Sequence, residues 1–154
     1  MAKIETERLY LYPVSNGEME KLIAEETNEE LQRAYQEMLQ GCINESDKRL
    51  WYAVWYMELK DKPGTIVGDF SFKGITADGM VELGYGLRKG FYGQGYMTEA
   101  VKSITSWALA QDGVTRVEAE TDPDNVASQK VLDKAGFRPT GKVGEEGPRY
   151  VRKA

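Results

Sequence analysis

The chain has 154 residues, of which 41% are hydrophobic and 29% charged, the length and balance of one globular domain covering residues 1–154. With no histidine and one cysteine, it lacks the groups of Ser-His-Asp and Cys-His catalysis and of zinc sites, so no metal is expected. A net charge of −5 argues against nucleic acid as a partner, and no run reaches the ~20 apolar residues of a membrane span. Cys42 suits a reducing compartment, so we expect an inert thiol and a cytoplasmic protein.

Apolar periodicity, capping residues and turn residues predict strands and helices along the whole chain. In chain order, the expected elements are strand 8–12, a helix capped by Ser15, a helix from Thr27 to Gly41, strands 51–60, 65–73 and 81–88, a helix after Gly95 that ends near Gly113, strand 116–121, a helix capped by Asp124 or Asn125 that ends at Gly136, and a final hairpin over 137–151. This order predicts a mixed α/β (α+β) domain around one central sheet.

The most informative segment is the glycine-rich stretch 87–96, which joins an expected strand to an expected helix. Consecutive backbone amides in such a loop, together with the positive end of the helix dipole, form an anion site. Gly93 and Gly95 have no side chain to keep a phosphate from the backbone. A plain tight turn is the alternative interpretation. No Gly-Lys-Ser/Thr follows, which excludes a Walker loop, and Thr98 stands where the dinucleotide fingerprint has its last glycine.

Further short motifs surround this loop. They are Thr6-Glu7-Arg8-Leu9, Glu82-Leu83-Gly84-Tyr85, Asn125 with Ser128, and Gly136-Phe137, while the loop itself continues as Gly93-Gln94-Gly95-Tyr96-Met97-Thr98-Glu99-Ala100. Together they resemble the GNAT superfamily of N-acetyltransferases, and most closely its branch of ribosomal-protein N-terminal acetyltransferases. The resemblance covers nearly the whole chain. It implies one GNAT-like domain with a mixed central sheet of six to seven strands, about four flanking helices, and fourth and fifth strands that splay apart.

The resemblance implies acetyl-CoA (coenzyme A) as the co-substrate. In that family the loop amides hold the diphosphate, and the pantetheine arm pairs like an extra strand with the fourth strand, whose glycines otherwise mark only a bulge. A backbone N–H near Leu87 or Arg88 would stabilise the oxyanion, and Asn125 would bind the pantetheine arm or serve only as a helix cap. The implied coenzyme-binding residues are Leu87, Arg88, Gly90, Phe91, Tyr92, Gly93, Gln94, Gly95, Tyr96, Asn125 and Ser128.

An alkylamine must lose a proton before it attacks a thioester, so the reaction needs a base or a water chain. We expect Glu82 to be that catalytic base, because strand alternation places it on the same face as Gly84 and Gly86. A solvated glutamate is the alternative interpretation. Glu118 and Glu120, on the fifth expected strand, are weaker candidates for the same role.

Two positions depart from the family's pattern. Leu132 stands where many relatives have a tyrosine that protonates the departing sulfur. Ser128 is then the candidate catalytic residue, as a donor or by ordering a water, and a surface cap is the alternative; a thiolate, with a pKa of ~8.5, can also leave without full proton assistance. Gly90 stands where many relatives have arginine or glutamine, which would loosen binding of the diphosphate.

The sequence leaves the acceptor amine open. Segment 18–37 carries seven glutamates against Lys21 and Arg33, which would attract cationic amines unless these are simply solvated helix faces. We expect acetylation of a protein or peptide N-terminus, with a small amine such as a polyamine or an aminoglycoside as the alternative, and a non-catalytic acyl-CoA sensor as the rival function. The expected partners are acetyl-CoA and an amine acceptor, without nucleic acid or membrane, for a monomer or homodimer.

Overall fold

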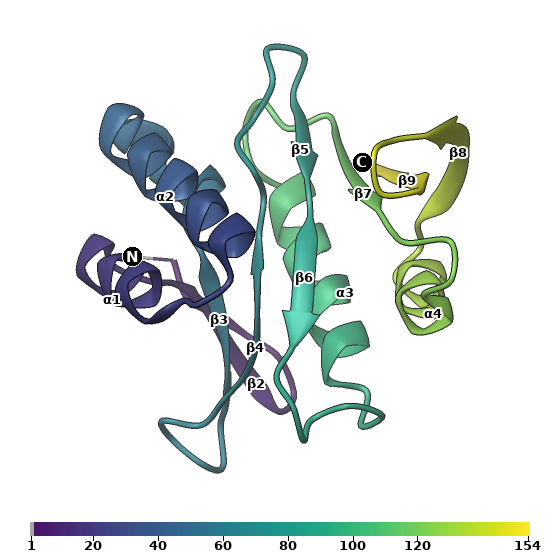
Figure 1. The fold of residues 1–154 in the computed structure, drawn as a ribbon. Helices are drawn as coiled ribbons and strands as arrows, with labels where there is room; N and C mark the ends of the chain where they lie inside the picture. Colours follow the sequence, from purple (N-terminus) through teal and green to yellow (C-terminus); the bar gives the residue numbers. More distant parts are fainter. Residues whose placement is uncertain (1) are drawn as a thin grey trace.

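The structure is a computed structural model that describes residues 2–154. Helices α1 and α2 pack together on one side, and α3 lies behind strands β5 and β6 (Figure 1). The elements are β1 (Ile4–Glu5), β2 (Leu9–Pro13), α1 (Asn16–Glu25), α2 (Glu29–Asn44), the 3-10 helix η1 (Ser46–Trp51), β3 (Trp55–Leu59), β4 (Ile66–Ser71), β5 (Met80–Glu82), β6 (Gly84–Leu87), α3 (Tyr96–Leu109), β7 (Arg116–Glu120), α4 (Val126–Lys134), β8 (Arg138–Val143) and β9 (Pro148–Lys153).

The strands form two sheets instead of one. The five-stranded sheet has the order β1-β2-β3-β4-β6 and is antiparallel, and the four-stranded sheet has the order β5-β7-β9-β8 with only β5 and β7 parallel. The mixed α/β class is confirmed. The expected sheet of six to seven strands becomes nine strands within residues 2–154, because one expected strand is divided and short β1 joins the edge.

The divided strand is the expected fourth one, residues 81–88. Its first part, β5, pairs with β7, and the N–H of Leu83 still donates to the carbonyl of Glu118 at 2.8 Å. Its second part, β6, ends the other sheet and pairs with β4. Strands β6 and β7 therefore separate after Leu83, which confirms the predicted splay. The edge of β6 that faces away from β4 has no neighbouring strand in the described part of the chain.

Polar side chains start the helices close to the predicted positions. The side chains of Ser15 and Asn125 each accept the N–H of the third residue onward, at 3.1 and 3.0 Å, as predicted for N-caps. The cap of α2 is Asn28 and not Thr27, since the Asn28 amide oxygen accepts the N–H of Leu31 at 3.0 Å. Residue type also favours Asn28, because asparagine is a better N-cap than threonine.

Two boundaries differ from the prediction around the end of α2. The helix passes through Gly41 and ends at Asn44. The ring of Tyr52 packs so closely against Gly41 that an added Cβ would lie 2.3 Å from the ring. Gly41 is therefore a packing position and not a helix stop. Trp51, expected at the start of a strand, closes the 3-10 helix η1, and β3 begins only at Trp55.

The apolar stripe predicted for α3 is its buried face. Met97, Val101, Ile104 and Ala108 are each at most 5% exposed and pack in one cluster with the buried aromatic residues of β3 and β4. Burying a methionine, valine or isoleucine side chain contributes ~1.5–3 kcal/mol to stability.

Cys42, in α2, belongs to a second buried cluster with Met19 of α1, and burial raises the pKa of its thiol. No helix within residues 2–154 is long and apolar enough to cross a membrane.

Candidate active site

A cleft of about 260 Å³ runs along the open edge of β6, between this strand, the loop before α3, and α4. Four residues predicted to bind coenzyme line it, together with five others. The lining residues are Tyr85, Gly86, Leu87, Tyr92, Met97, Asn125, Ala127, Ser128 and Val131. The fold therefore brings one strand edge and one helix start to a single cleft, although 30 or more residues separate these segments in the sequence.

The open edge of β6 presents main-chain groups to the cleft. The N–H of Arg88 donates to the carbonyl of Val67 at 2.8 Å, and the N–H of Leu83 faces β7. Since successive residues of a strand point their N–H groups to opposite sides, the N–H groups of Tyr85 and Leu87 face the open edge. Of the two amides predicted to stabilise an oxyanion, only that of Leu87 is turned to the cleft.

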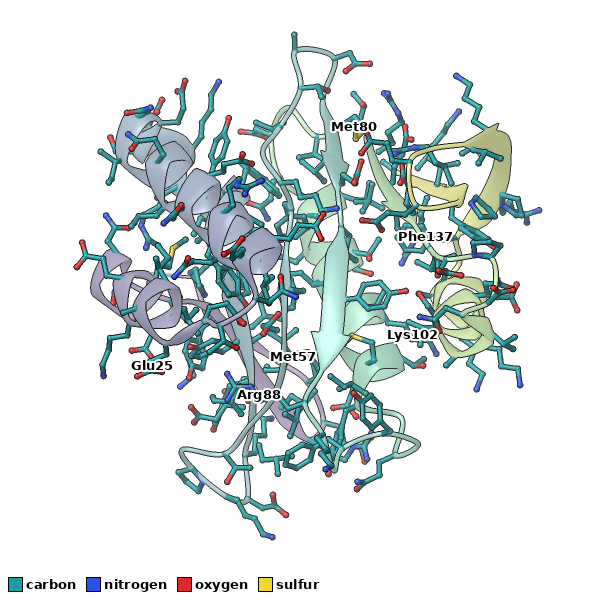
Figure 2. The ribbon with its side chains drawn as sticks, viewed as in Figure 1. Glu25, Met57, Met80, Arg88, Lys102 and Phe137 are labelled. Atoms are coloured by element: carbon teal, nitrogen blue, oxygen red, sulfur yellow. The ribbon has the colours of Figure 1, made fainter. Side chains whose placement is uncertain are left out.

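Arg88 is directed away from the cleft in its side chain as well. Its guanidinium lies 5.5 Å from the centre of the Tyr56 ring in β3. Figure 2 shows Arg88 on the β3 side of β6, away from α4. Strand alternation explains this direction, because Arg88 follows Leu87, whose side chain lines the cleft.

The loop from Lys89 to Gly95 turns at glycines with left-handed backbone angles. Gly93 and Gly95 have φ angles of 76° and 80°, in the left-handed region that favours glycine. Gly95 is the N-cap of α3 and provides no side-chain oxygen, so the first amides of α3 lack a side-chain cap. A Cβ added at Gly90 or Gly93 meets no atom within 4 Å, so this side of the loop is open to a ligand.

Two hydroxyl groups meet inside the cleft. The hydroxyl of Tyr85 in β6 lies 2.8 Å from Oγ of Ser128 in α4. Burial raises the pKa of Tyr85 although the bond to Ser128 opposes the shift, so the phenol stays protonated at neutral pH. Leu132, one turn further along α4, is fully buried and has no hydroxyl to offer. Sequence reasoning missed Tyr85. The available signal was that Tyr85 shares a strand face with the apolar residues Leu83 and Leu87.

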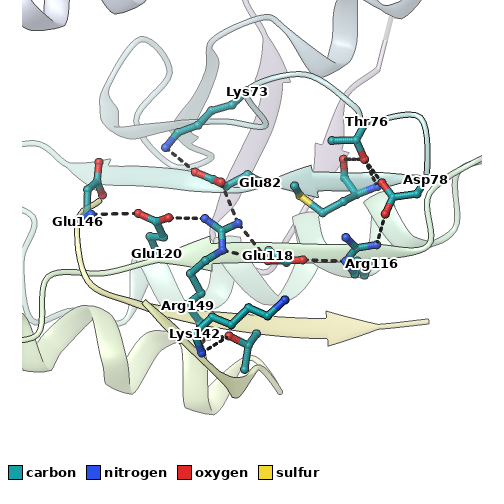
Figure 3. A network of polar contacts seen from close by, with 12 residues as sticks. Lys73, Thr76, Asp78, Glu82, Arg116, Glu118, Glu120, Lys142, Glu146 and Arg149 are labelled. Atoms are coloured by element: carbon teal, nitrogen blue, oxygen red, sulfur yellow. Dashed lines mark hydrogen bonds and ion pairs between the residues drawn. The ribbon is translucent and has the colours of Figure 1, made fainter. Parts of the chain in front are cut away.

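Glu82, the predicted base, does not line the cleft and lies in an ion-pair network with Lys73 and Arg149 (Figure 3). Its carboxylate is 3.0 Å from Nζ of Lys73 and 3.0 Å from a guanidinium nitrogen of Arg149. Burial raises the pKa of Glu82, but the bonds from Lys73 and Arg149 outweigh it and leave the pKa below its ordinary value. A carboxylate that holds two cations and has a lowered pKa is a weak proton acceptor near pH 7. The geometry therefore does not favour Glu82 as a general base.

The two weaker candidates belong to the same network. Arg149 in β9 also pairs with Glu118, at 3.0 Å, and with Glu120, both in β7 (Figure 3). Their side chains are 15% and 11% exposed, so the guanidinium lies among mostly buried carboxylates. Burial raises the pKa of Glu118, but its bonds to Arg116 and Arg149 hold it below the ordinary value. Sequence reasoning missed Arg149, because only the pairing of β7 with β9 brings it opposite Glu120.

No group of histidine, cysteine or acidic side chains within residues 2–154 is arranged to hold a metal ion. The site consists instead of a glycine loop at a helix start, a free strand edge and two hydroxyl groups. A family model described as the acetyltransferase (GNAT) domain matches residues 5–138, so this chain belongs to the GNAT acetyltransferase family.

The curated relatives are named as N-acetyltransferases. The chain is 38% identical over 84 residues to the uncharacterized N-acetyltransferase YjdG of Bacillus subtilis, an alignment that covers 54% of this chain and 49% of the relative. It is 25% identical over 149 residues to the uncharacterized N-acetyltransferase YoaA of the same organism, covering 90% of this chain and 84% of the relative. The alignments with the first curated relatives span half of their length or less.

Solved structures share the fold at low identity. The ribosomal L7/L12 alpha-N-protein acetyltransferase RimL, solved in complex with coenzyme A, has a TM-score of 0.74 at 17% identity and covers 99% of this chain and 98% of its own. The ribosomal-protein-S5-alanine acetyltransferase of Vibrio fischeri has a TM-score of 0.75 at 18% identity, covering 98% of this chain and 94% of its own. These likenesses confirm the fold predicted from the motifs.

Proposed function

We propose that this protein transfers the acetyl group of acetyl-CoA to a primary amine. The observation that carries the proposal is the open edge of β6 ending at a glycine loop and a helix start. Loop amides and the helix dipole attract a diphosphate, and a free strand edge pairs with a chain that contains amide groups, as pantetheine does. The uncrowded side of Gly90 and Gly93 leaves room for such a ligand.

The chemistry assigned to the cleft is direct attack on the thioester. The amine nitrogen forms the new C–N bond, and the N–H of Leu87 stabilises the oxyanion. The C–S bond then breaks, and the sulfur takes a proton from the hydroxyl of Ser128, which Tyr85 holds at 2.8 Å. The proton released by the amine leaves to water, from which Ser128 is protonated again. Asn125, which caps α4 at the cleft, provides a polar group for the pantetheine arm.

Replacing Glu82 by glutamine is expected to lower kcat/KM less than tenfold at pH 7, because Glu82 serves an ion-pair network. Loss of a general base costs ~10²–10⁴-fold. Glu118→Gln, which breaks a bond to the same Arg149, is the matched control, and the two variants should behave alike in steady-state kinetics. Ser128→Ala should lower kcat more than either. A loss of about 100-fold confined to Glu82→Gln would restore Glu82 as the base.

The acceptor is proposed to be a protein or peptide N-terminus. Two structural neighbours are named as a ribosomal L7/L12 alpha-N-protein acetyltransferase and a ribosomal-protein-S5-alanine acetyltransferase, and both align with nearly the whole of this chain. Helices α1 and α2 add an acidic surface, on which five of the seven glutamates of segment 18–37 are exposed. Such a surface attracts the positively charged end of a peptide as well as a small cationic amine.

A panel of acceptors tests this function. Purified protein with acetyl-CoA should acetylate peptides that begin with free serine or alanine, and the same peptides with a blocked N-terminus should be inert. Spermidine and kanamycin represent the small amines, and activity confined to these would contradict the peptide acceptor. Calorimetric binding of coenzyme A without transfer to any acceptor would identify an acyl-CoA sensor, which the ion-paired Glu82 and buried Leu132 favour.

A further inference from the structure

The amino-terminal motif Thr6-Glu7-Arg8-Leu9 has no role in the chemistry described so far, yet it contacts the glycine loop directly. Nη1 of Arg8 donates to the carbonyl of Gln94 at 2.9 Å. The guanidinium also stacks on the ring of Tyr96, with its central carbon 4.3 Å from the ring centre. Tyr96 is the first residue of α3, so Arg8 touches both the loop and the start of the helix.

Arg8 is itself held in place by Glu99, in the first turn of α3. The carboxylate accepts the main-chain N–H of Arg8 at 2.8 Å, its Nε at 2.7 Å, and the hydroxyl of Thr6. The Glu99 side chain is 17% exposed. Burial raises the pKa of Glu99, but the bonds from Thr6 and Arg8 outweigh it, so the carboxylate is ionised at neutral pH. The planar guanidinium thus bridges a fixed carboxylate and a loop carbonyl, which an ammonium group cannot do with the same geometry.

The Arg8 contact determines how the peptide plane before Gly95 is oriented. In a trans peptide the carbonyl of one residue and the N–H of the next point in opposite directions. Because the Gln94 carbonyl is held toward Arg8, the N–H of Gly95 points away from Arg8. Arg8 and Tyr96 also line a hollow of about 160 Å³ that shares no lining residue with the cleft. The Arg8 contact therefore fixes the direction in which the Gly95 amide is presented.

We propose that Thr6, Arg8 and Glu99 are positioning residues that preorganise the glycine loop for a diphosphate. The inference rests on the proposed use of acetyl-CoA. An unrestrained glycine loop would sample other peptide orientations, and binding would then have to restrict them. Thr6, Arg8 and Glu99, which we call the clamp, restrict these orientations before the ligand binds. The contacts of Arg8 with Glu99 and Gln94 join residues more than 80 positions apart in the sequence. The clamp acts on the loop and does not touch the ligand.

Arg8→Ala is expected to raise the calorimetric Kd for coenzyme A about tenfold or more, and the KM for acetyl-CoA in parallel. The KM for the acceptor should change less than twofold. S-acetylpantetheine, which has no diphosphate, should be used equally by Arg8→Ala and by the unchanged protein. Arg8→Lys should restore little, because one ammonium replaces two directed contacts. Hydrogen exchange of segment 90–96 should become faster in Arg8→Ala without ligand, while that of α1 stays the same.

Lys60→Ala is the matched control. Lys60 lies beside Arg8 in the same hollow and pairs with Glu5 at 3.0 Å, but has no contact with the loop. Its Kd for coenzyme A should stay within twofold of the unchanged protein. Thr6→Val removes one hydrogen bond to Glu99 at nearly constant volume. It provides a second test of the clamp if Arg8→Ala unfolds at a lower temperature than the unchanged protein. Binding by Arg8→Ala and Thr6→Val at full affinity would overturn the clamp alone. Failure of the unchanged protein to bind coenzyme A would overturn the proposed function and the clamp together.

Discussion

Gly93→Val is expected to weaken coenzyme A binding about 100-fold or more, the largest effect on binding that the structure predicts. The φ of Gly93 is 76°, and a side chain in this region costs ~1–2 kcal/mol, more for a branched one. The loop would relieve this strain by turning its amides, each of which is worth ~1.5–3 kcal/mol to a charged ligand. A loss of ~2.7 kcal/mol corresponds to 100-fold in Kd.

The control for Gly93→Val is Gly64→Val in the turn between β3 and β4. Gly64 has a φ of 88° and, like Gly93, no atom within 4 Å of an added Cβ. Both substitutions place a branched side chain at a left-handed φ, and Gly93→Val should lose no more stability in urea unfolding than Gly64→Val, because its loop can relieve the strain by turning. Only Gly93→Val should lose affinity in calorimetry. Equal affinities of the two variants would show that the loop does not hold the diphosphate.

Arg149→Met is expected to cause the largest loss of stability, ~3 kcal/mol in the free energy of unfolding at pH 7. It leaves the carboxylates of Glu82, Glu118 and Glu120 close together without their shared cation, and removing one partner of a buried ion pair typically costs ~3–5 kcal/mol. We take the lower end, because these side chains are partly exposed and Lys73 remains beside Glu82. Urea unfolding at pH 7 measures the loss.

The loss in Arg149→Met should shrink as the pH falls. In the unchanged protein the pKa values of Glu82 and Glu118 are lowered by folding, so their stabilisation is present above the unfolded pKa of ~4.3 and disappears as the pH falls through the folded values. Without Arg149 the carboxylates bind protons more readily in the folded state, which removes their repulsion. The difference in the free energy of unfolding between the unchanged protein and Arg149→Met should therefore be smaller at pH 4 than at pH 7.

Arg152→Met is the control for this experiment. Arg152 lies in the same strand, but its guanidinium donates to the neutral oxygens of Ala135 and Ser106. The loss of unfolding free energy in Arg152→Met should be smaller than that in Arg149→Met and nearly independent of pH between 7 and 4. A pH-independent loss in Arg149→Met would instead mean that packing of the long side chain, and not its charge, stabilises the sheet.

Local features of this site could be predicted from the sequence. The glycine loop, the Asn125 cap and the buried stripe of α3 each depend on residues within one turn or one loop of each other, and the structure has all three. The splay of the expected fourth and fifth strands came from resemblance and not from periodicity. No local pattern marks residue 83 as the point where one strand passes from one sheet to the other.

Features that depend on pairing between distant segments could not be predicted. Alternation places Glu82 on the face of Gly84 and Gly86, but its ion pairs come from Lys73, which follows β4, and from Arg149 in the last strand. The contact of Arg8 with Gln94 likewise requires β2 to lie beside the start of α3. The order of charges along the chain does not show which residues of neighbouring strands lie opposite each other. The ion pairs of a candidate base are therefore seen only in the assembled sheets.

The separation of β6 from β7 also limits how far an extended ligand can lie along the free edge of β6. A chain that starts beside Leu87 and follows the free edge toward Leu83 can advance about 13 Å, since a strand rises ~3.3 Å per residue. There the hydrogen bond from the N–H of Leu83 to the carbonyl of Glu118 rejoins the two strands. The main chain itself is the end wall, and its position depends on backbone pairing and not on any one side chain.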